Sequence, residues 1–310
     1  MRPSCEEEPV DNDEINERDY HPLIPENIST HFLPGTGIEI VRDLGHFGPP
    51  QHVLLDFDGT VSLIREGWQD VMVPLMVEEI LAATKTDETE EALRRSVREY
   101  VDYLTGKQTI YQMIHLAGDI RKRGGKAEDP LVYKHRYLER LMKRIAERRQ
   151  GLRSGRVDPA EMLVPHTIEM LEGLKDRGVQ LYLASGTDEK YVLEEARLLR
   201  IDRYFGPHIY GAQDAYHAFS KRLVIERILK INNVDGTRLL GFGDGYVEIE
   251  NIKSVGGLAV AVASDEVRRN GVPDEWKRRR LIGIGADIVI PDYRDHQVLL
   301  RYIWNNNEVA

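Results

Sequence analysis

Two acidic residues separated by one position, Asp56 and Asp58, are the feature of this 310-residue chain best suited to chemistry. They follow the apolar run 53–55 and precede a Gly-Thr pair, so a predicted strand delivers both to a turn. Residues two apart in an extended segment point to the same side. Like charges so placed need a cation between them, or pKa values that are driven apart. The simpler alternative is a strand that ends in an Asp-Gly turn.

Two further segments offer groups that bind anions. The apolar run 181–184 ends in Ser185 and Gly186 and is followed by a helix-like stretch, a pattern that presents a hydroxyl and free backbone N–H groups to an anion. Lys221 stands near the start of the helix-like segment 220–231. A lysine in such a place is by itself more often a solvated side chain.

A third strand-like run, 239–243, ends at another acid, Asp244, and Glu248 follows four residues later. Carboxylate oxygens are the hard ligands that suit Mg²⁺. The segment therefore adds a candidate metal site to the pair of acids upstream.

The elements that must position these residues alternate along the chain. Apolar strand-like runs alternate with helical stretches, which predicts a parallel sheet covered by helices on both faces, a doubly wound α/β fold. In such a sheet ligands bind at the carboxyl ends of the strands, so we expect the candidate residues to converge on one crevice. The predicted strands are 53–57, 179–184, 208–210, 238–242, 258–263 and 287–290, and 37–41 is either a short strand or a packed lead-in.

The long stretch between the segment of Asp56 and Asp58 and the segment of Ser185 contains no good strand. Residues 63–165 contain helix-like stretches instead and are too long for a simple crossover, so we expect an inserted α-helical cap domain there. The predicted helices are 70–83, 88–104, 108–123 and 129–150.

In this order and spacing, the four segments resemble the haloacid dehalogenase superfamily, and within it the phosphoglycolate phosphatase-like proteins with an inserted helical cap. The resemblance covers about residues 50 to 300. The matching residues are Asp56-Phe57-Asp58-Gly59-Thr60 for the first motif, Ser185 for the second, Lys221 for the third, and Gly243-Asp244 with Glu248 for the fourth.

The resemblance implies roles for these residues. Asp56 would be the nucleophile and Asp58 the general acid and base, Ser185, Gly186 and Lys221 would bind phosphate, and Mg²⁺ would be held by Asp56, the carbonyl of Asp58 and Asp244. The family more often has Asp where this chain has Glu248, whose extra methylene leaves both a direct and a water-mediated metal contact open. A cap in this family closes over the crevice and contacts the organic part of the substrate. The candidates for that contact are Arg65, Trp68, Gln69, Lys107 and Gln108.

Composition limits the partners. A net charge of −10 disfavours nucleic acid, and the basic run 277–280 is interpreted as a solvated helix face. No apolar run approaches a membrane span and the N-terminus is acidic, so we expect neither a membrane segment nor a signal peptide. With Cys5 as the only cysteine, neither an internal disulfide nor a multi-cysteine zinc site can form, which favours the cytoplasm. The predicted units are a flexible acidic tail (1–35), a catalytic core (36–62 and 166–310) and the cap (63–165).

The sequence thus predicts a Mg²⁺-dependent phosphatase that acts on a small phosphorylated metabolite, such as a sugar phosphate or a phosphoglycolate-like compound, through an aspartyl-phosphate. A phosphomutase needs the same four motifs and is the alternative enzyme. A binding or scaffold protein without catalysis is the alternative of another class.

Overall fold

A sheet of eight strands organises the chain. The computed structural model describes residues 19–25, 28–45, 47–214 and 219–304. Strands β3 to β8 run parallel, whereas β1 and β2 join antiparallel at one edge, and the spatial order is β1-β2-β8-β7-β6-β3-β4-β5. The predicted α/β fold with a parallel sheet is confirmed. The strands are β1 His31–Phe32, β2 Glu39–Ile40, β3 His52–Leu55, β4 Gln180–Asp188, β5 Ile209–Ala212, β6 Leu239–Gly243, β7 Leu258–Val262 and β8 Ile288–Ile290.

Helices cover both faces of the sheet because its strands are apolar on both sides. In the central strand β3, Val53 and Leu55 pack into the core beneath α6, α7 and α12, whereas Leu54 packs among residues of α9, α10 and α11. Alternate residues of a strand point to opposite faces, so a continuous apolar run fills two layers. The helices outside the insert are α6 Thr167–Lys175, α7 Glu189–Leu198, α8 Asp202–Phe205, α9 Lys221–Asn232, α10 Tyr246–Ser254, α11 Glu275–Gly283 and α12 His296–Trp304.

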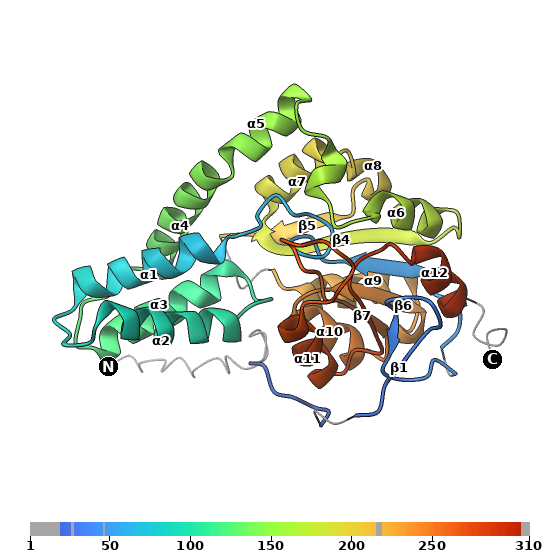
Figure 1. Cartoon of the computed structure of the whole chain (residues 1–310), viewed down its shortest axis with the longest axis horizontal. Coiled ribbons are helices and arrows are strands. Elements are labelled where there is room, and N and C mark those ends of the chain that lie inside the picture. Colours follow the sequence, from blue (N-terminus) through green and yellow to red (C-terminus); the bar gives the residue numbers. More distant parts are fainter. Residues whose placement is uncertain (1–18, 26–27, 46, 215–218, 305–310) are drawn as a thin grey trace, which may run out of the picture.

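The stretch between β3 and β4 is helical, and we call α1 to α5 the helical insert. It forms a lobe beside the sheet, from which α5 returns toward α7 (Figure 1). Two of its helices begin at side-chain caps, where Thr89 accepts a hydrogen bond from the Ala92 amide and Asp129 accepts one from the Leu131 amide. The predicted helix 129–150 is divided at Ile145, which is fully buried. The bounds are α1 Gln69–Ala83, α2 Glu90–Tyr103, α3 Thr109–Lys122, α4 Pro130–Arg144 and α5 Ala146–Ser154.

The segment before β2 differs from the flexible tail predicted for residues 1–35. The amides of Leu23 and Ile24 donate to the carbonyl of Gly283, and β1 pairs with β2. Tyr20 also packs edge-on against Tyr246. The acidic composition of the segment led to the prediction of a flexible tail, although a few apolar and aromatic residues hold its second half against the core. Residues 1–18 of the predicted tail lie outside the described residues. No helix in the described ranges combines the length and the apolar character needed to span a bilayer.

Candidate active site

The carboxyl end of β3 carries the two acids identified from the sequence. The Asp56 amide donates to the carbonyl of Phe242 on neighbouring β6 at 2.9 Å, which continues the sheet up to the acidic pair. The chain then turns at Gly59, whose φ is +74° and where an added Cβ would lie 2.1 Å from Oδ2 of Asp244. A side chain cannot fit there, so the turn needs glycine to bring Asp244 beside the acidic pair.

Lys221 reaches the first acid. Its Nζ lies 2.6 Å from Oδ1 of Asp56 and also forms an ion pair with Glu248, and all three side chains are buried. The Ser220 side chain caps α9 by accepting a hydrogen bond from the Leu223 amide, which places Lys221 at the first position of the helix. The structure therefore places Glu248 against the same lysine that contacts Asp56.

The second acid has a separate environment. Thr187 Oγ1 donates to Oδ2 of Asp58 at 2.7 Å, and the Ser185 hydroxyl lies 3.5 Å from the same oxygen. Sequence reasoning missed Thr187, although it stands two residues after Ser185 on β4, the spacing that places side chains on one side of a strand. The opposite oxygen of Asp58, Oδ1, is buried and has no hydrogen-bond partner among the described residues.

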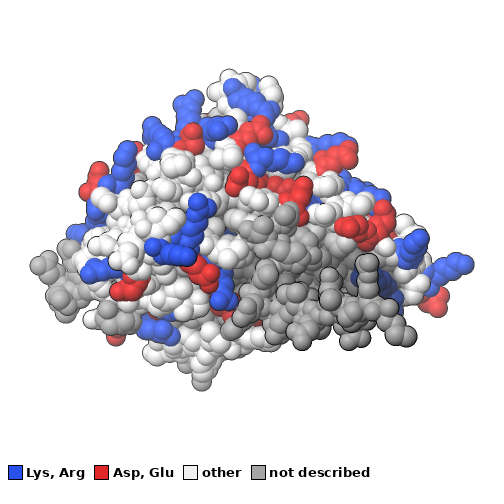
Figure 2. Space-filling model, turned by 180° about the vertical axis from the view of Figure 1, so that it is seen from behind, with Lys and Arg blue, Asp and Glu red and all other residues white. Residues whose placement is uncertain are grey.

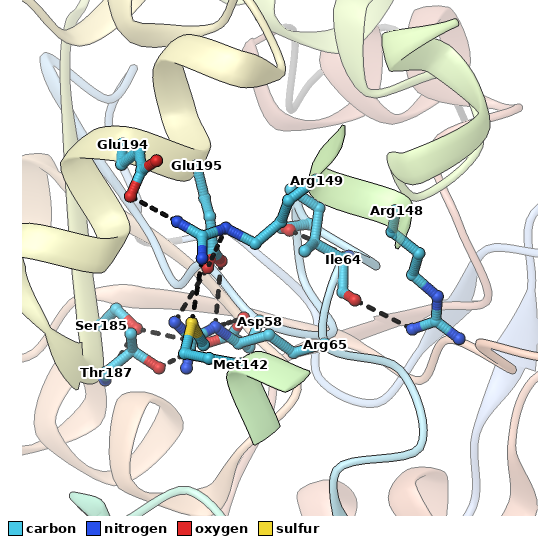
Figure 3. Close-up of polar contacts among 11 residues, drawn as sticks. Asp58, Ile64, Arg65, Met142, Arg148, Arg149, Ser185, Thr187, Glu194 and Glu195 are labelled. Carbon is cyan, nitrogen blue, oxygen red and sulfur yellow. Dashed lines mark hydrogen bonds and ion pairs between the residues drawn. The ribbon is translucent and has the colours of Figure 1, made fainter. Parts of the chain in front are cut away.

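A buried ion pair lies next to that unpartnered oxygen. The Arg65 guanidinium donates from Nε and Nη2 to the two carboxylate oxygens of Glu195, at 2.9 and 3.0 Å. Arg65 Nε also lies 3.7 Å from Oδ1 of Asp58 (Figure 3). Arg65 was a candidate for substrate contact, and the structure gives much of its donor capacity to Glu195, a residue that the sequence analysis did not identify.

Asp244 has a lysine of its own, which sequence reasoning interpreted wrongly. Nζ of Lys277 lies 2.8 Å from Oδ2 of Asp244, 2.8 Å from Oε1 of Glu266 and 3.3 Å from Oγ of Ser264. The run 277–280 was expected on a solvated helix face. Residues three apart on a helix share one side, however, and both Lys277 and Arg280 point inward from α11.

Burial raises the pKa values of both acids at the end of β3. The pKa of Asp56 rises to about 6 because the group is desolvated and Asp244 repels its charge, an effect that Lys221 opposes. The pKa of Asp58 rises to about 7 because of desolvation and the negative charge of Glu195, against the attraction of Arg65. A carboxyl with a pKa near neutrality can both give and take a proton, whereas Asp56 is held against an ammonium.

A cavity of about 110 Å³ opens over these groups. Arg65, Trp68 and Lys107 line it, as does Gln112 of α3, which the sequence analysis did not select. The other lining residues are Asp56, Asp58, Gly59, Ser62, Glu66, Met72, Thr105, Gly106, Thr109, Tyr137, Leu141, Ser185, Gly186, Thr187, Lys221, Asp244 and Glu266.

Two candidate substrate residues lie elsewhere. Gln69 donates to Asp102 at 3.1 Å, joining α1 to α2, and Gln108 donates to the carbonyl of Phe219 at 2.8 Å, joining the helical insert to the core. Neither lines the cavity. Lys107 does line it and also pairs with Asp19, Nζ to Oδ1 being 2.7 Å.

The helical insert packs closely against the loop that follows β6, at a contact between two glycines. Gly106 has a φ of +104°, and a Cβ added there would lie 3.1 Å from the Cα of Gly245. The ion pair between Nζ of Lys134 on α4 and Oδ1 of Asp188, at 2.7 Å, makes a second link. The cavity is therefore bounded by the carboxyl ends of the strands on one side and by the helical insert on the other.

The oxygen ligands at the cavity fit a small divalent cation. No group of three or more metal-ligating side chains converges within the described ranges. Asp56 and Asp244 nevertheless lie close enough for the charge of Asp244 to raise the pKa of Asp56, and a cation between two such carboxylates would relieve that repulsion. Glu248 turns to Lys221 instead. The carboxylates of Asp56 and Asp244 are thus the side-chain donors here that fit Mg²⁺.

Solved structures share this fold. A haloacid dehalogenase-like protein of unknown function from Agrobacterium tumefaciens superposes with a TM-score of 0.55 at 15% identity, over 82% of this chain and 99% of that one. A predicted phosphoglycolate phosphatase from Haemophilus somnus superposes with a TM-score of 0.52 at 16% identity, over 81% and 97%. A predicted phosphatase from Clostridium acetobutylicum gives 0.51 at 15% identity, over 82% and 100%.

Sequence comparison identifies the family. No curated protein sequence matches the chain significantly. The family described as haloacid dehalogenase-like hydrolase matches residues 50–256, which contain Asp56, Asp58, Ser185, Lys221 and Asp244. This match covers well over half of the chain. The resemblance seen in the sequence motifs is confirmed, and the chain belongs to the haloacid dehalogenase-like hydrolases.

Proposed function

We propose that this protein is a Mg²⁺-dependent phosphatase that hydrolyses a phosphate monoester of a small polar metabolite. The observation that supports it most is the contrast between two acids at one strand end. Asp56 is held against Lys221, whereas Asp58, which lines the cavity, keeps one buried oxygen that accepts no hydrogen bond from the described residues. A nucleophile next to a cation and a separate proton donor are the two groups that covalent phosphoryl transfer needs.

In the first step, a carboxylate oxygen of Asp56 attacks phosphorus and forms a P–O bond as the ester oxygen leaves. Asp58 gives its proton to that leaving oxygen. Lys221, the Ser185 hydroxyl and backbone N–H groups beside Gly186 offset charge on the transferring phosphoryl oxygens. When bound, Mg²⁺ supplies further positive charge for the same purpose.

In the second step, water attacks the phosphorus of the aspartyl-phosphate. Asp58, now a carboxylate, takes a proton from that water, the bond to Asp56 breaks, and phosphate leaves. Both acids return to their starting states, so the reaction consumes only water and the ester. A phosphomutase would use the same groups but return the phosphoryl group to a sugar.

The lining of the cavity supports a small polar substrate. The cavity of about 110 Å³ has polar walls that suit a phosphoryl group with a polar organic part, and the helical insert, which we propose acts as the cap, contributes Thr105, Thr109 and Gln112 as neutral polar groups. Lysine and arginine are interspersed with acidic side chains over the face in Figure 2, which favours a small substrate over a polyanion.

Phosphate release across a panel of small phosphate esters tests the proposal. The matched control is the Asp56→Asn variant, and each assay is run after chelation and again after Mg²⁺ is restored. The proposal expects Mg²⁺-dependent phosphate release from at least one ester and none above background from the variant. An isomeric sugar phosphate that accumulates without free phosphate would establish a mutase. Turnover of no ester, including an aryl phosphate, would favour a non-catalytic protein.

A further inference from the structure

The two oxygens of Asp58 are treated differently by the protein. Oδ2 accepts from Thr187 at 2.7 Å, with Ser185 at 3.5 Å, whereas Oδ1 is buried and has no hydrogen-bond partner in the described part of the chain. Asp58 lines the cavity, and Oδ1 is its oxygen without a hydrogen bond; Oδ1 is closed to solvent in this arrangement, so a turn of the carboxyl group is needed to present it to a substrate atom. The Arg65 cation, with Nε only 3.7 Å from Oδ1, is the group that could occupy it.

Glu195 keeps that cation occupied. It is fully buried on α7, and its carboxylate takes both Nε and Nη2 of Arg65 (Figure 3). A bidentate arginine–carboxylate pair fixes the plane of the guanidinium as well as its distance. The Nε–H that faces Glu195 at 2.9 Å cannot at the same time donate at full strength to Asp58.

The backbone on both sides of Arg65 is also fixed. Nη1 of Arg148 on α5 donates to the carbonyl of Ile64 at 2.9 Å and to that of Glu66 at 2.8 Å. The neighbouring Arg149 pairs with Glu194, the residue before Glu195 (Figure 3), and Arg153 pairs with Glu194 as well. The position of Arg65 is therefore set at its backbone by α5 and at its guanidinium by α7.

We infer that Glu195 is a positioning residue: by holding the Arg65 guanidinium it prevents a hydrogen bond from Arg65 to Oδ1 of Asp58, and so leaves that oxygen to bond the leaving-group oxygen. This inference rests on the proposed function, in which Asp58 protonates that oxygen. If the Glu195 charge is removed, Asp58 becomes the nearest carboxylate to a buried cation. Arg65 then turns to Oδ1 and takes the place of the leaving group.

The test uses leaving groups that differ in their need for a proton. An unactivated alkyl phosphate needs the acid, whereas 4-nitrophenyl phosphate releases a stable anion without it. The quantity measured is kcat/KM, which reports steps up to release of the leaving group and excludes hydrolysis of the aspartyl-phosphate. Glu195→Gln is compared with wild type, with Asp58→Ala and with Glu194→Gln, the matched change at the neighbouring, partly exposed position.

We expect Glu195→Gln to lower kcat/KM by about 10²-fold for the alkyl ester, the usual scale for loss of a positioned acid. The loss for the aryl ester should be only about tenfold. Glu194→Gln should change both by less than about twofold, as a partly exposed ion pair contributes little. The double variant Arg65→Gln/Glu195→Gln removes the cation and should recover most of the loss for the alkyl ester. If Glu195→Gln does not fold, Arg65→Lys, which cannot bridge both oxygens of Glu195, should show the same dependence on the leaving group.

The outcomes separate this inference from the proposed function. Equal losses for the two esters in Asp58→Ala would remove Asp58 as the general acid, and the proposed mechanism with it. Discrimination by Asp58→Ala but equal losses, or no loss, in Glu195→Gln would overturn the role of Glu195 alone. Failure of the double variant to recover would do the same.

Discussion

The carboxyl ends of the strands and the helical insert contribute different groups to one cavity. At the strand ends, charged side chains are buried and paired with opposite charges: Lys221 faces Asp56, and Lys277 faces Asp244. The insert contributes mainly neutral groups, such as Gln112 and Thr109. Its lysine at the cavity, Lys107, forms an ion pair with Asp19. Under the proposed function, this difference assigns the chemistry to fixed charges in the core and the selection of the organic group to the insert. Changes at the strand ends should therefore affect rate, and changes in the insert should affect substrate choice.

The largest effect should come from Asp56→Asn. An amide is a poor nucleophile and also loses the charge opposite Lys221, so we expect kcat to fall by about 10⁴-fold or more while the fold persists. Phosphate release and circular dichroism check the two parts. A variant that keeps more than about a tenth of the wild-type rate, roughly 1.4 kcal/mol of barrier, would contradict a covalent mechanism at the strand ends.

The next effects should separate Asp244 from Glu248 in Mg²⁺ titrations. Asp244→Ala removes a proposed Mg²⁺ ligand beside Asp56, and saturating Mg²⁺ should not restore its activity. Glu248→Ala should weaken Mg²⁺ affinity by roughly 10- to 100-fold, the usual effect of changing a residue that contacts metal ligands without binding the metal itself. Excess metal should restore much of the rate. Calorimetric Mg²⁺ binding gives the same ordering without turnover. An unchanged Mg²⁺ dependence in Glu248→Ala would limit that residue to its contact with Lys221.

A smaller effect is expected in the insert. Gln112→Ala removes a polar group from the cavity, so KM for the preferred ester should rise by about tenfold, one lost hydrogen bond, with kcat nearly unchanged. Gln69→Ala is the matched control because Gln69 bonds Asp102 outside the cavity. Equal effects of the two substitutions would show that the insert contributes stability rather than selection.

The smallest effect concerns stability. The pKa of Asp58 is about 7 in the folded protein against 3.8 ordinarily, so the folded state binds more protons and its stability falls as pH rises from about 4 to about 7. Asp58→Asn removes this penalty. Metal-free Asp58→Asn should melt a few degrees above wild type at pH 8 and near it at pH 4. A difference that is constant with pH would show that Asp58 is not destabilised by its burial.

Sequence periodicity predicted which residues lie together at the carboxyl ends of the strands, because parallel strands bring those ends to one side of the sheet. The positions of Asp56, Asp244 and Ser185 follow directly from strands β3, β6 and β4. The residues that surround them were harder to find. Lys277 lies in a basic run that resembles a solvated face, and its direction depends on how α11 packs against the sheet.

Glu195 and the N-terminal segment show why other contacts escaped. Glu195 follows another glutamate, and only its place between Val192 and Ala196 on the apolar side of α7 distinguishes it from a solvated acid. The contacts of Tyr20 with Tyr246 and of Asp19 with Lys107 join residues far apart in the chain. Such pairs have no local pattern, so a single sequence cannot predict them.

Trapping the phosphoryl group tests the central claim most directly. The protein is mixed with its best ester and Mg²⁺, quenched in acid within one turnover, digested, and analysed by mass spectrometry. Our account predicts a phosphoryl group on the peptide that contains Asp56, at the carboxylate of that residue, and none in Asp56→Asn. Single-turnover phosphate release with no phosphoryl group on that peptide, at any quench time, would contradict it.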